Sequence, residues 1–277
     1  MLSYQHLYHA GNFADVHKHL ALLLILQALQ RKPAGLQVLD THAGSGCYDL
    51  DAARALKTEE FRDGIARLWS SPEPALADYL ARVRAENPDG RLRVYPGSPL
   101  LVQSLLRTQD RLALCELHPG EYGALRRLMA GDSRVAVHRR DGFEALGALL
   151  PPRLTRGLVL IDPSYERKHE YDRVAASLIG ACRRWPQGVY LAWYPLLAAG
   201  RHRHLLRTLQ RSGLRAILVS ELCVFRPDEA PGLYGSGLVL VHPPWQLDRT
   251  LGALTEGLAR CLARGTPRAH TDWLVAE

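Results

Sequence analysis

Short runs of consecutive apolar residues recur along the chain, and several end in a charged or turn-forming residue. Continuous runs of valine, leucine and isoleucine are typical of strands that are buried on both faces of a sheet. We expect strands at residues 36–40, 112–116, 135–138, 158–162, 189–193, 216–224 and 238–242. Helix-length stretches lie between most of them, including 122–130 and 201–211. The pattern therefore predicts repeated β-α-β units and an open, doubly wound α/β sheet.

Residues 49–93 interrupt this alternation. Two patches with helical spacing, at 61–69 and 76–86, are separated by the run Ser70-Ser71-Pro72-Glu73-Pro74. Proline and serine clusters of this kind separate regular elements. We interpret the segment as a small helical insertion after the first strand, within one domain that spans residues 1–277.

A dense apolar run at residues 20–29 precedes the first expected strand. It is ten residues long, whereas a helix needs about 20 apolar residues to span a membrane. We therefore expect a buried helix here and no membrane attachment. Because the first residues also lack the apolar segment of a signal peptide, a cytoplasmic protein is expected.

The composition is that of a globular protein, because 47% of the 277 residues are hydrophobic and 23% are charged. These proportions exclude a disordered chain, a collagen and a coiled coil. Lysine and arginine (35) outnumber aspartate and glutamate (28), and the net charge of +7 suits a polyanion such as a nucleic acid. Only four of these basic residues are lysines, so an arginine-rich genome would produce the same excess. The five cysteines form no Cys-x-x-Cys pair and predict neither a disulfide framework nor a zinc site.

A Gly-x-Gly turn, Gly44 to Gly46, follows the first expected strand. Glycines there let the backbone approach a nucleotide-like ligand, and the absence of a third glycine favours a cofactor without a pyrophosphate. An acidic residue that ends the next strand commonly binds ribose hydroxyl groups. We choose Glu116, which closes an apolar strand, over Glu60, which lies in an apparent helix. The alternative is that Glu116 only caps the segment that follows it.

The pair Asp141-Gly142 comes just after the strand expected at 135–138. In a doubly wound sheet, ligands bind beyond the carboxyl ends of the strands, so Asp141 is placed to contact an adenine edge. The alternative is an ordinary Asp-Gly turn.

The strand expected at 158–162 ends in Asp162-Pro163-Ser164-Tyr165. This run resembles the (Asp/Asn)-Pro-Pro-(Tyr/Phe) motif of S-adenosylmethionine-dependent amino-methyltransferases. An exocyclic amine is a poor nucleophile because its lone pair is delocalised into the base, so a nearby group must accept its protons during methyl transfer. We expect the Asp162 carboxylate and the Pro163 carbonyl group to hold the amine and stabilise its developing charge, and Tyr165 to stack on the base.

Ser164 departs from the second proline of that motif. A proline at this position would restrict the backbone of the residue before it, so serine is expected to lower rigidity without loss of activity. A second run, His242-Pro243-Pro244-Trp245, ends the last expected strand. Because histidine cannot supply a carboxylate, we interpret this run as a structural strand exit.

Two histidine pairs have a spacing that metal ligands can adopt. His17-x-His19 is accompanied by no third ligand of matching spacing, so no metal site is expected. His202-x-His204 lies among arginines on an expected helix, where a solvated or phosphate-facing surface is the better interpretation.

Eight blocks of sequence together resemble the RlmJ (formerly YhiR) family of 23S rRNA adenine-N6 methyltransferases in order and spacing. The blocks are His9-Ala10-Gly11-Asn12 with Asp15 and Lys18-His19, Leu39-Asp40-Thr41-His42-Ala43-Gly44, Tyr95-Pro96-Gly97-Ser98-Pro99, Glu116-Leu117-His118-Pro119, Asp141-Gly142-Phe143, Asp162-Pro163-x-Tyr165, Trp193-Tyr194-Pro195 and Ser236-Gly237. The resemblance covers essentially the whole chain. It implies a class I S-adenosylmethionine methyltransferase fold, which is Rossmann-like with a mostly parallel seven-stranded sheet.

The resemblance also implies the cofactor and its site. S-adenosylmethionine would be converted to S-adenosylhomocysteine in a pocket lined by Lys18, His19, His42, Ser98, Glu116, Asp141, Gly142 and Asp162, beside the turn at Gly44. Asp162 would be the proton acceptor. Lys18 and His19 could neutralise the carboxylate of the cofactor.

The implied partner is 23S rRNA, with one adenine N6 as the methyl acceptor and a monomeric enzyme. Tyr4 would contact the RNA. Arginines that could face phosphates, or be ordinary surface charges, are Arg139, Arg140, Arg201, Arg203 and Arg207. Two other readings stay open: methylation of another exocyclic amine, such as guanine N2 or a DNA adenine, and an inactive RNA-binding module of the same fold.

Overall fold

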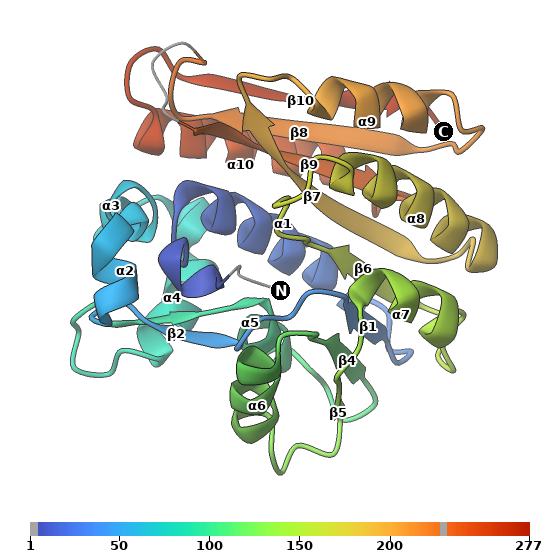
Figure 1. The fold of residues 1–277 in the computed structure, drawn as a ribbon, viewed down its shortest axis with the longest axis horizontal. Helices are drawn as coiled ribbons and strands as arrows, with labels where there is room; N and C mark the ends of the chain where they lie inside the picture. Colours follow the sequence, from blue (N-terminus) through green and yellow to red (C-terminus); the bar gives the residue numbers. More distant parts are fainter. Residues whose placement is uncertain (1–4, 228–231) are drawn as a thin grey trace.

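An eight-stranded sheet forms the centre of the structure, a computed structural model that describes residues 5–227 and 232–277 (Figure 1). The strand order is β10-β8-β9-β7-β6-β1-β4-β5. The bounds are β1 Gln37–Asp40, β4 Arg111–Cys115, β5 Val135–His138, β6 Gly157–Ile161, β7 Val189–Leu197, β8 Ile217–Cys223, β9 Leu233–Val241 and β10 Arg268–Val275. The predicted Rossmann-like, class I methyltransferase architecture is confirmed, but the expectation of seven strands is wrong.

Five neighbouring strands, from β5 through β4, β1 and β6 to β7, run parallel. Their register aligns the carboxyl ends, because Asp40 of β1 lies between Leu114 of β4 and Leu160 of β6. The apolar runs of β1, β4, β6 and β7 are largely buried, most completely in β6, where every residue is buried, whereas no residue of the edge strand β5 is buried. The residues that follow β1, β4, β5 and β6 therefore meet at one edge of the sheet.

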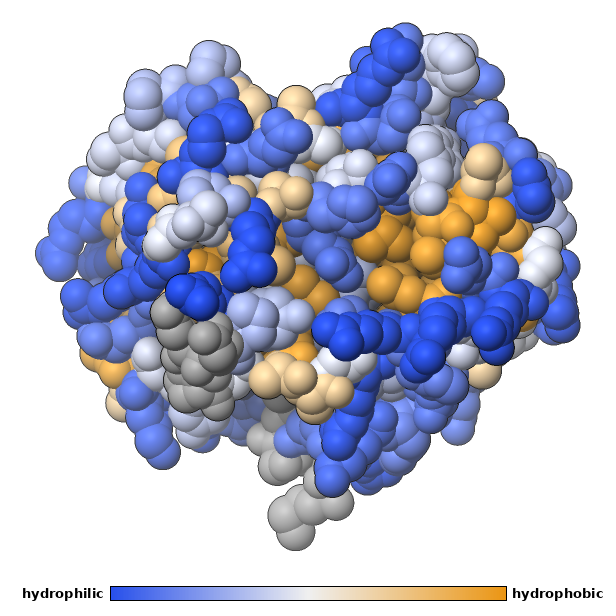
Figure 2. Space-filling view, turned by 90° about the horizontal axis from the view of Figure 1, so that it is seen from above, coloured by the Kyte–Doolittle hydropathy of each residue, from blue (hydrophilic) through white to orange (hydrophobic). Residues whose placement is uncertain are grey.

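The other part of the sheet is antiparallel. Strand β9 pairs antiparallel with β7 and β8, and β10 adds to β8 as the additional edge strand. Alternate residues of β10, namely Arg268, His270 and Asp272, are exposed and charged or titratable, which is typical of an edge strand protected against further pairing. Figure 2 views the molecule from this side and shows a mostly hydrophilic surface, with its most extensive apolar area on the right.

Helices cover both faces of the sheet in a three-layer arrangement. One core cluster joins the sheet to α1 (Phe13–Gln30), α4 (Ala77–Ala85), α5 (Ser98–Gln103), α6 (Pro119–Leu128) and α10 (Leu247–Leu262). The second joins the opposite face to α7 (Gly142–Leu149), α8 (Glu170–Arg184) and α9 (His202–Gln210). The buried helix predicted at 20–29 is confirmed as part of α1. No helix in the described residues is long and apolar enough to span a membrane.

Short helices fill residues 49–93. They are α2 (Ala53–Thr58), η2 (Glu60–Asp63), α3 (Ile65–Leu68), η3 (Pro74–Leu76) and α4. A small antiparallel pair, β2 (Cys47–Asp49) and β3 (Val94–Pro96), joins the two ends of the segment. Its description as an insertion stays a prediction, and β2 and β3 were not expected from the sequence.

The first turns of α1 place polar and ionisable residues near the carboxyl ends of the parallel strands. Asn12 caps the helix, because its Oδ1 accepts hydrogen bonds from the backbone N–H groups of Ala14 and Asp15 at 2.9 Å. A short helix, η1 (His6–Tyr8), precedes it. The first turns of α1 are buried, including its polar residues Asp15, His17, Lys18 and His19. Buried polar groups need partners, and each of these four side chains has at least one hydrogen-bond partner.

Candidate active site

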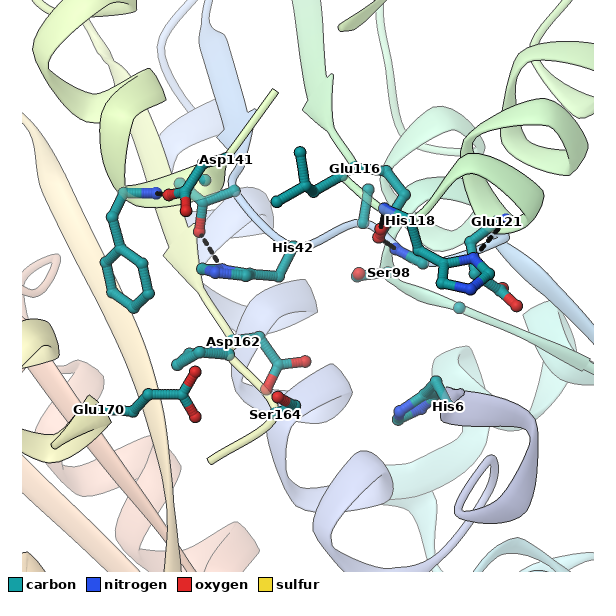
Figure 3. Close-up of a pocket in the computed structure, with 18 of the residues that line it drawn as sticks. His6, His42, Ser98, Glu116, His118, Glu121, Asp141, Asp162, Ser164 and Glu170 are labelled. Atoms are coloured by element: carbon teal, nitrogen blue, oxygen red, sulfur yellow. Dashed lines mark hydrogen bonds between the residues drawn. The ribbon is translucent and has the colours of Figure 1, made fainter. Parts of the chain in front are cut away.

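A cavity of about 290 Å³ lies where the parallel strands end. Gly44, Glu116, Asp141 and Asp162, which follow β1, β4, β5 and β6, all line it. In Figure 3, Asp141 and His42 lie on one side, Glu116 and His118 on another, and Asp162 with Ser164 lies across from them. The predicted meeting of these strand ends in one cleft is confirmed. Other predicted residues that line the cavity are Lys18, His19, His42, Ser98, Gly142 and Pro163.

A buried lysine contacts the predicted proton acceptor. Lys18 is 4% exposed, and its Nζ donates to Asp162 Oδ2 at 2.5 Å and to Asp15 Oδ1 at 2.8 Å. Burial alone would lower the pKa of Lys18, but the charges of Asp15 and Asp162 outweigh it and hold that pKa above its ordinary value. Lys18 is therefore a cation at neutral pH that fixes one oxygen of Asp162.

Asp15, the other acceptor of Lys18, is itself held by further hydrogen bonds. Its Oδ2 accepts hydrogen bonds from His6 Nε2 at 2.8 Å and from the backbone N–H of Gly11 at 2.9 Å. Burial acts to raise the pKa of Asp15, but His6 and Lys18 outweigh it and hold that pKa well below its usual range. Asp15 is thus a buried anion, and its negative charge is stabilised by His6 and Lys18.

Replacing Lys18 by methionine is expected to lower the free energy of unfolding by about 3 kcal/mol, because it leaves Asp15 and Asp162 without their buried cation. Urea unfolding at pH 7.5 measures the change. Lys57→Met, which removes an exposed lysine of α2, is the matched control and should change stability little. Equal stabilities of the two variants would show that the Lys18 network does not support the fold.

The neighbouring histidines of α1 point to different partners. His17 Nδ1 lies 3.0 Å from Ser236 Oγ, and His19 Nδ1 lies 2.9 Å from Tyr95 Oη. The two rings are therefore engaged separately, and no group of His, Cys, Asp or Glu in residues 5–227 and 232–277 could hold a metal ion. Burial lowers the pKa of His19 to about 3. At neutral pH, only Lys18 of the predicted pair can therefore offer positive charge to a cofactor carboxylate.

Glu116 braces the glycine turn. Its Oε2 accepts the backbone N–H of Gly44 at 2.8 Å, and its Oε1 accepts the backbone N–H of His118 at 2.6 Å. Gly44 has φ +60, and an added Cβ would lie 2.2 Å from Tyr48 Oη, so glycine is required there. Each carboxylate oxygen keeps a further acceptor site. Glu116 therefore both braces the turn and offers acceptors to hydroxyl groups in the cavity.

Asp40 is a buried acid that the sequence interpretation missed. It ends β1, is 0% exposed, and accepts hydrogen bonds from Ser98 Oγ at 2.7 Å and the backbone N–H of His42 at 3.2 Å. Burial raises its pKa to about 6. Because Ser98 uses its only hydrogen on Asp40, its oxygen can act towards the cavity only as an acceptor.

Asp141 is the residue immediately before α7, and it has both a structural contact and a place in the cavity lining. Its Oδ1 accepts the backbone N–H groups of Phe143 at 2.8 Å and Glu144 at 3.3 Å, which caps the helix. It also lines the cavity. An added Cβ on Gly142 would lie 2.0 Å from the carbonyl oxygen of Thr41, so only glycine lets α7 approach β1 this closely.

His42 has a defined tautomer in this arrangement. Thr41 Oγ1 donates to the carbonyl oxygen of Leu160 at 2.8 Å, so it can only accept from His42 Nδ1, also at 2.8 Å. The Nε2 atom is then an acceptor in the neutral ring. Burial lowers the pKa of His42 to about 4, which keeps the ring neutral at physiological pH.

Tyr165 does not line the cavity, although Asp162, Pro163 and Ser164 do. Its hydroxyl group donates to the carbonyl oxygen of Trp193 at 2.7 Å, and its ring packs against Tyr171 and Trp193. Its backbone has φ +55, which is unusual for a tyrosine. The base-stacking role of Tyr165 stays a prediction.

Several other predicted residues lie away from the cavity. His242 follows β9, and its Nδ1 lies 3.2 Å from the carbonyl oxygen of Gly188, the residue before β7. Its Pro-Pro-Trp run therefore lies at the end of the sheet opposite to the cavity. The interpretation of this run as a strand exit agrees with that position. Arg139 and Arg140 are exposed just before Asp141. Tyr4 lies outside the described residues.

The expected solvated histidine pair of α9 is wrong for one member. His202 is 6% exposed and stacks on Tyr194 at an interplanar angle of 14°. His204 is exposed and pairs with Asp172 at 3.2 Å. Arg201 is half-buried, whereas Arg203 and Arg207 are exposed. Only the exposed members can face a partner.

Known proteins resemble this chain in sequence and in structure. The family described as "Ribosomal RNA large subunit methyltransferase D, RlmJ" matches residues 33–275. Proteins named "Ribosomal RNA large subunit methyltransferase J" from Escherichia coli K12 and Haemophilus influenzae are 41% and 42% identical over 280 and 283 residues, with both chains covered completely in each case. A crystal structure of a Legionella pneumophila protein is 36% identical, has a TM-score of 0.89, and covers 96% of this chain and 98% of that chain.

Proposed function

This chain belongs to the ribosomal RNA large subunit methyltransferase J family, and we propose that it transfers a methyl group from S-adenosylmethionine to N6 of one adenine in 23S rRNA. The observation that carries the proposal is the cavity in which Gly44, Glu116 and Asp162 meet. Incubation with protein-free 23S rRNA and labelled S-adenosylmethionine, followed by nucleoside mass spectrometry, tests it. N6-methyladenosine is the expected product. Label in N2-methylguanosine, or no label, would overturn the assignment.

The chemical groups in the cavity match those of S-adenosylmethionine. Asp141 offers a carboxylate acceptor to an adenine amino group, and Glu116 offers acceptors to ribose hydroxyl groups. The Lys18 ammonium has three donors, of which Asp15 and Asp162 use two. The third can meet the carboxylate of the cofactor. When bound, S-adenosylmethionine supplies an electrophilic methyl group on a sulfonium.

Asp162 is the group that would receive the amine proton. Its Oδ2 is held by Lys18, which leaves Oδ1 to accept a hydrogen bond from the target amine. The Pro163 carbonyl oxygen is the second acceptor, and together they orient the nitrogen lone pair towards the methyl group. A methylated, positively charged aromatic amine is a strong acid. Proton transfer to Asp162 is therefore favourable once the nitrogen–carbon bond forms.

The adenine has to enter from the Asp162 end, because the opposite end would hold the nucleoside part of the cofactor. Ser164, Glu166 and Arg167 line the cavity at this end, and the exposed Lys168 follows them. A base removed from an RNA structure would reach Asp162 past this loop. Phosphates beside that base would then lie near Arg167 and Lys168.

Replacing both Arg167 and Lys168 by alanine is expected to weaken RNA binding and to reduce the salt dependence, the slope of log K against log salt, by about 1.5. Filter binding to protein-free 23S rRNA fragments at several salt concentrations measures this slope. The pair Arg139→Ala and Arg140→Ala tests the other predicted phosphate contacts in the same way. An unchanged slope in the Arg167 and Lys168 variant would exclude the proposed entry side.

A further inference from the structure

An arginine of α8 holds the acid predicted to recognise the adenine of the cofactor. Arg173 Nη2 lies 3.1 Å from Asp141 Oδ1 and 3.0 Å from Asp141 Oδ2. Its guanidinium carbon lies 4.2 Å from the centroid of the Phe143 ring, a cation–π contact. Arg173, Asp141 and Phe143 all line the cavity. The arginine thus contacts both the acid and the aromatic residue two positions after it.

The two oxygens of Asp141 are used differently. Oδ1 receives the backbone N–H groups of Phe143 and Glu144 as well as Arg173. Within residues 5–227 and 232–277, Oδ2 has one donor, Arg173. A carboxylate oxygen has about two lone-pair sites, so those of Oδ1 are occupied and one of Oδ2 is open. Oδ2 is therefore the atom that can accept a hydrogen bond from a ligand, and Arg173 is the residue that fixes its direction.

His42 packs against Phe143, and the groups around Asp141 keep its carboxyl group ionised. The ring of His42 meets Phe143 edge-on, with centroids 5.0 Å apart and an interplanar angle of 71°. Burial acts to raise the pKa of Asp141, but the Glu144 backbone N–H and the Arg173 charge outweigh it and hold that pKa below its usual value. Asp141 thus stays an anion, which can accept but not donate a hydrogen bond.

We propose that Arg173 is a positioning residue for cofactor specificity: it holds Asp141 Oδ2 toward the ligand so that the site selects a 6-amino purine over a 6-oxo purine. This inference rests on the proposed function, because it takes S-adenosylmethionine as the ligand. A 6-amino group donates to Oδ2, whereas a 6-oxo group would place an oxygen against a carboxylate. A site built to bond one group rejects an analogue that cannot form the bond.

The test is calorimetric titration of the full chain with S-adenosylhomocysteine and with S-inosylhomocysteine, its 6-oxo analogue. Arg173→Ala is expected to weaken binding of S-adenosylhomocysteine about tenfold, a modest factor because the arginine is partly exposed. Binding of the 6-oxo analogue should change much less, so the preference between the two ligands should shrink. Arg173→Lys, which keeps the charge, should restore part of the preference.

Steady-state kinetics give a second measurement that a general loss of structure would not reproduce. Arg173→Ala should raise KM for S-adenosylmethionine and leave kcat nearly unchanged, since Arg173 does not contact the reacting atoms. Arg183→Ala removes an exposed arginine of the same helix and is the matched control, with wild-type affinity expected.

Two results would overturn the inference. One is wild-type affinity of Arg173→Ala for S-adenosylhomocysteine, and the other is equal loss of affinity for both ligands, which indicates only a damaged pocket. Failure of the wild-type protein to bind S-adenosylhomocysteine at all would instead refute the proposed function, and this inference with it. The wild-type titration therefore distinguishes the two failures.

Discussion

Replacing Asp162 by asparagine is expected to slow methyl transfer about a thousandfold, the range of a lost proton acceptor. Asparagine keeps the shape of the side chain and its contact with Lys18, but its Oδ1 or Nδ2 cannot take a proton from the amine. Binding of S-adenosylhomocysteine should stay close to wild type, because Gly44, Glu116 and Asp141 are unchanged. The loss should therefore appear in kcat rather than in KM.

Single-turnover transfer of labelled methyl groups to 23S rRNA measures the rate, and calorimetry measures the binding. The matched control is Asp172→Asn on α8, whose side chain is 63% exposed and lies outside the cavity lining. It should leave the rate unchanged. A wild-type rate for Asp162→Asn would remove Asp162 from its proposed role.

Acidification is expected to destabilise the protein strongly, by about 4 kcal/mol between pH 7 and pH 5. Burial lowers the pKa of His17 and His19 to about 3 and that of His42 to about 4, whereas an unfolded histidine titrates near 6.5. Below about pH 6.5 the unfolded chain therefore binds protons that the folded chain cannot, and stability falls as pH falls. Asp40, whose pKa burial raises to about 6, offsets part of this loss because it binds a proton only when folded.

Urea unfolding at several pH values between 7.5 and 5 tests this expectation. His17→Asn removes one of the three histidines and keeps a polar group near Ser236, which His17 contacts at 3.0 Å. The variant should show a smaller slope of stability against pH, with a difference that grows towards about 1.4 kcal/mol per pH unit below about pH 6. The slope is the informative quantity, since the substitution will also change the absolute stability. Identical slopes would mean that His17 titrates normally in the folded protein.

The sheet was largely predictable because its strands carry their own signal. Four of the five parallel strands, β1, β4, β6 and β7, are largely buried, so each appears in the sequence as an apolar run. The antiparallel part has weaker signals. Gly235 and Gly237 interrupt the first half of β9, and Gly237 is needed because an added Cβ would lie 2.1 Å from the Tyr194 ring. Strand β10 alternates exposed and half-buried residues, a pattern that was not interpreted as a strand.

The cavity lining was predictable where residues come within three positions of a strand end, as Glu116, Asp141 and Asp162 do. The interactions between these residues and the helices were not. Lys18 contacts Asp162 across 144 positions of sequence, and no local pattern indicates such a pair. Arg173 resembles any other arginine of an amphipathic helix until Asp141 is seen opposite it. Charge pairing across a fold depends on tertiary packing, which a single sequence does not display.

The proposed role of Asp162 in methylating an adenine of large-subunit rRNA can be tested in cells. The most direct measurement compares N6-methyladenosine in 23S rRNA from cells that lack the chain, cells that carry it, and cells that carry Asp162→Asn. We expect that one N6-methyladenosine disappears without the chain, returns with the wild-type protein, and does not return with the variant. A 23S rRNA whose N6-methyladenosine is the same in all three would contradict it.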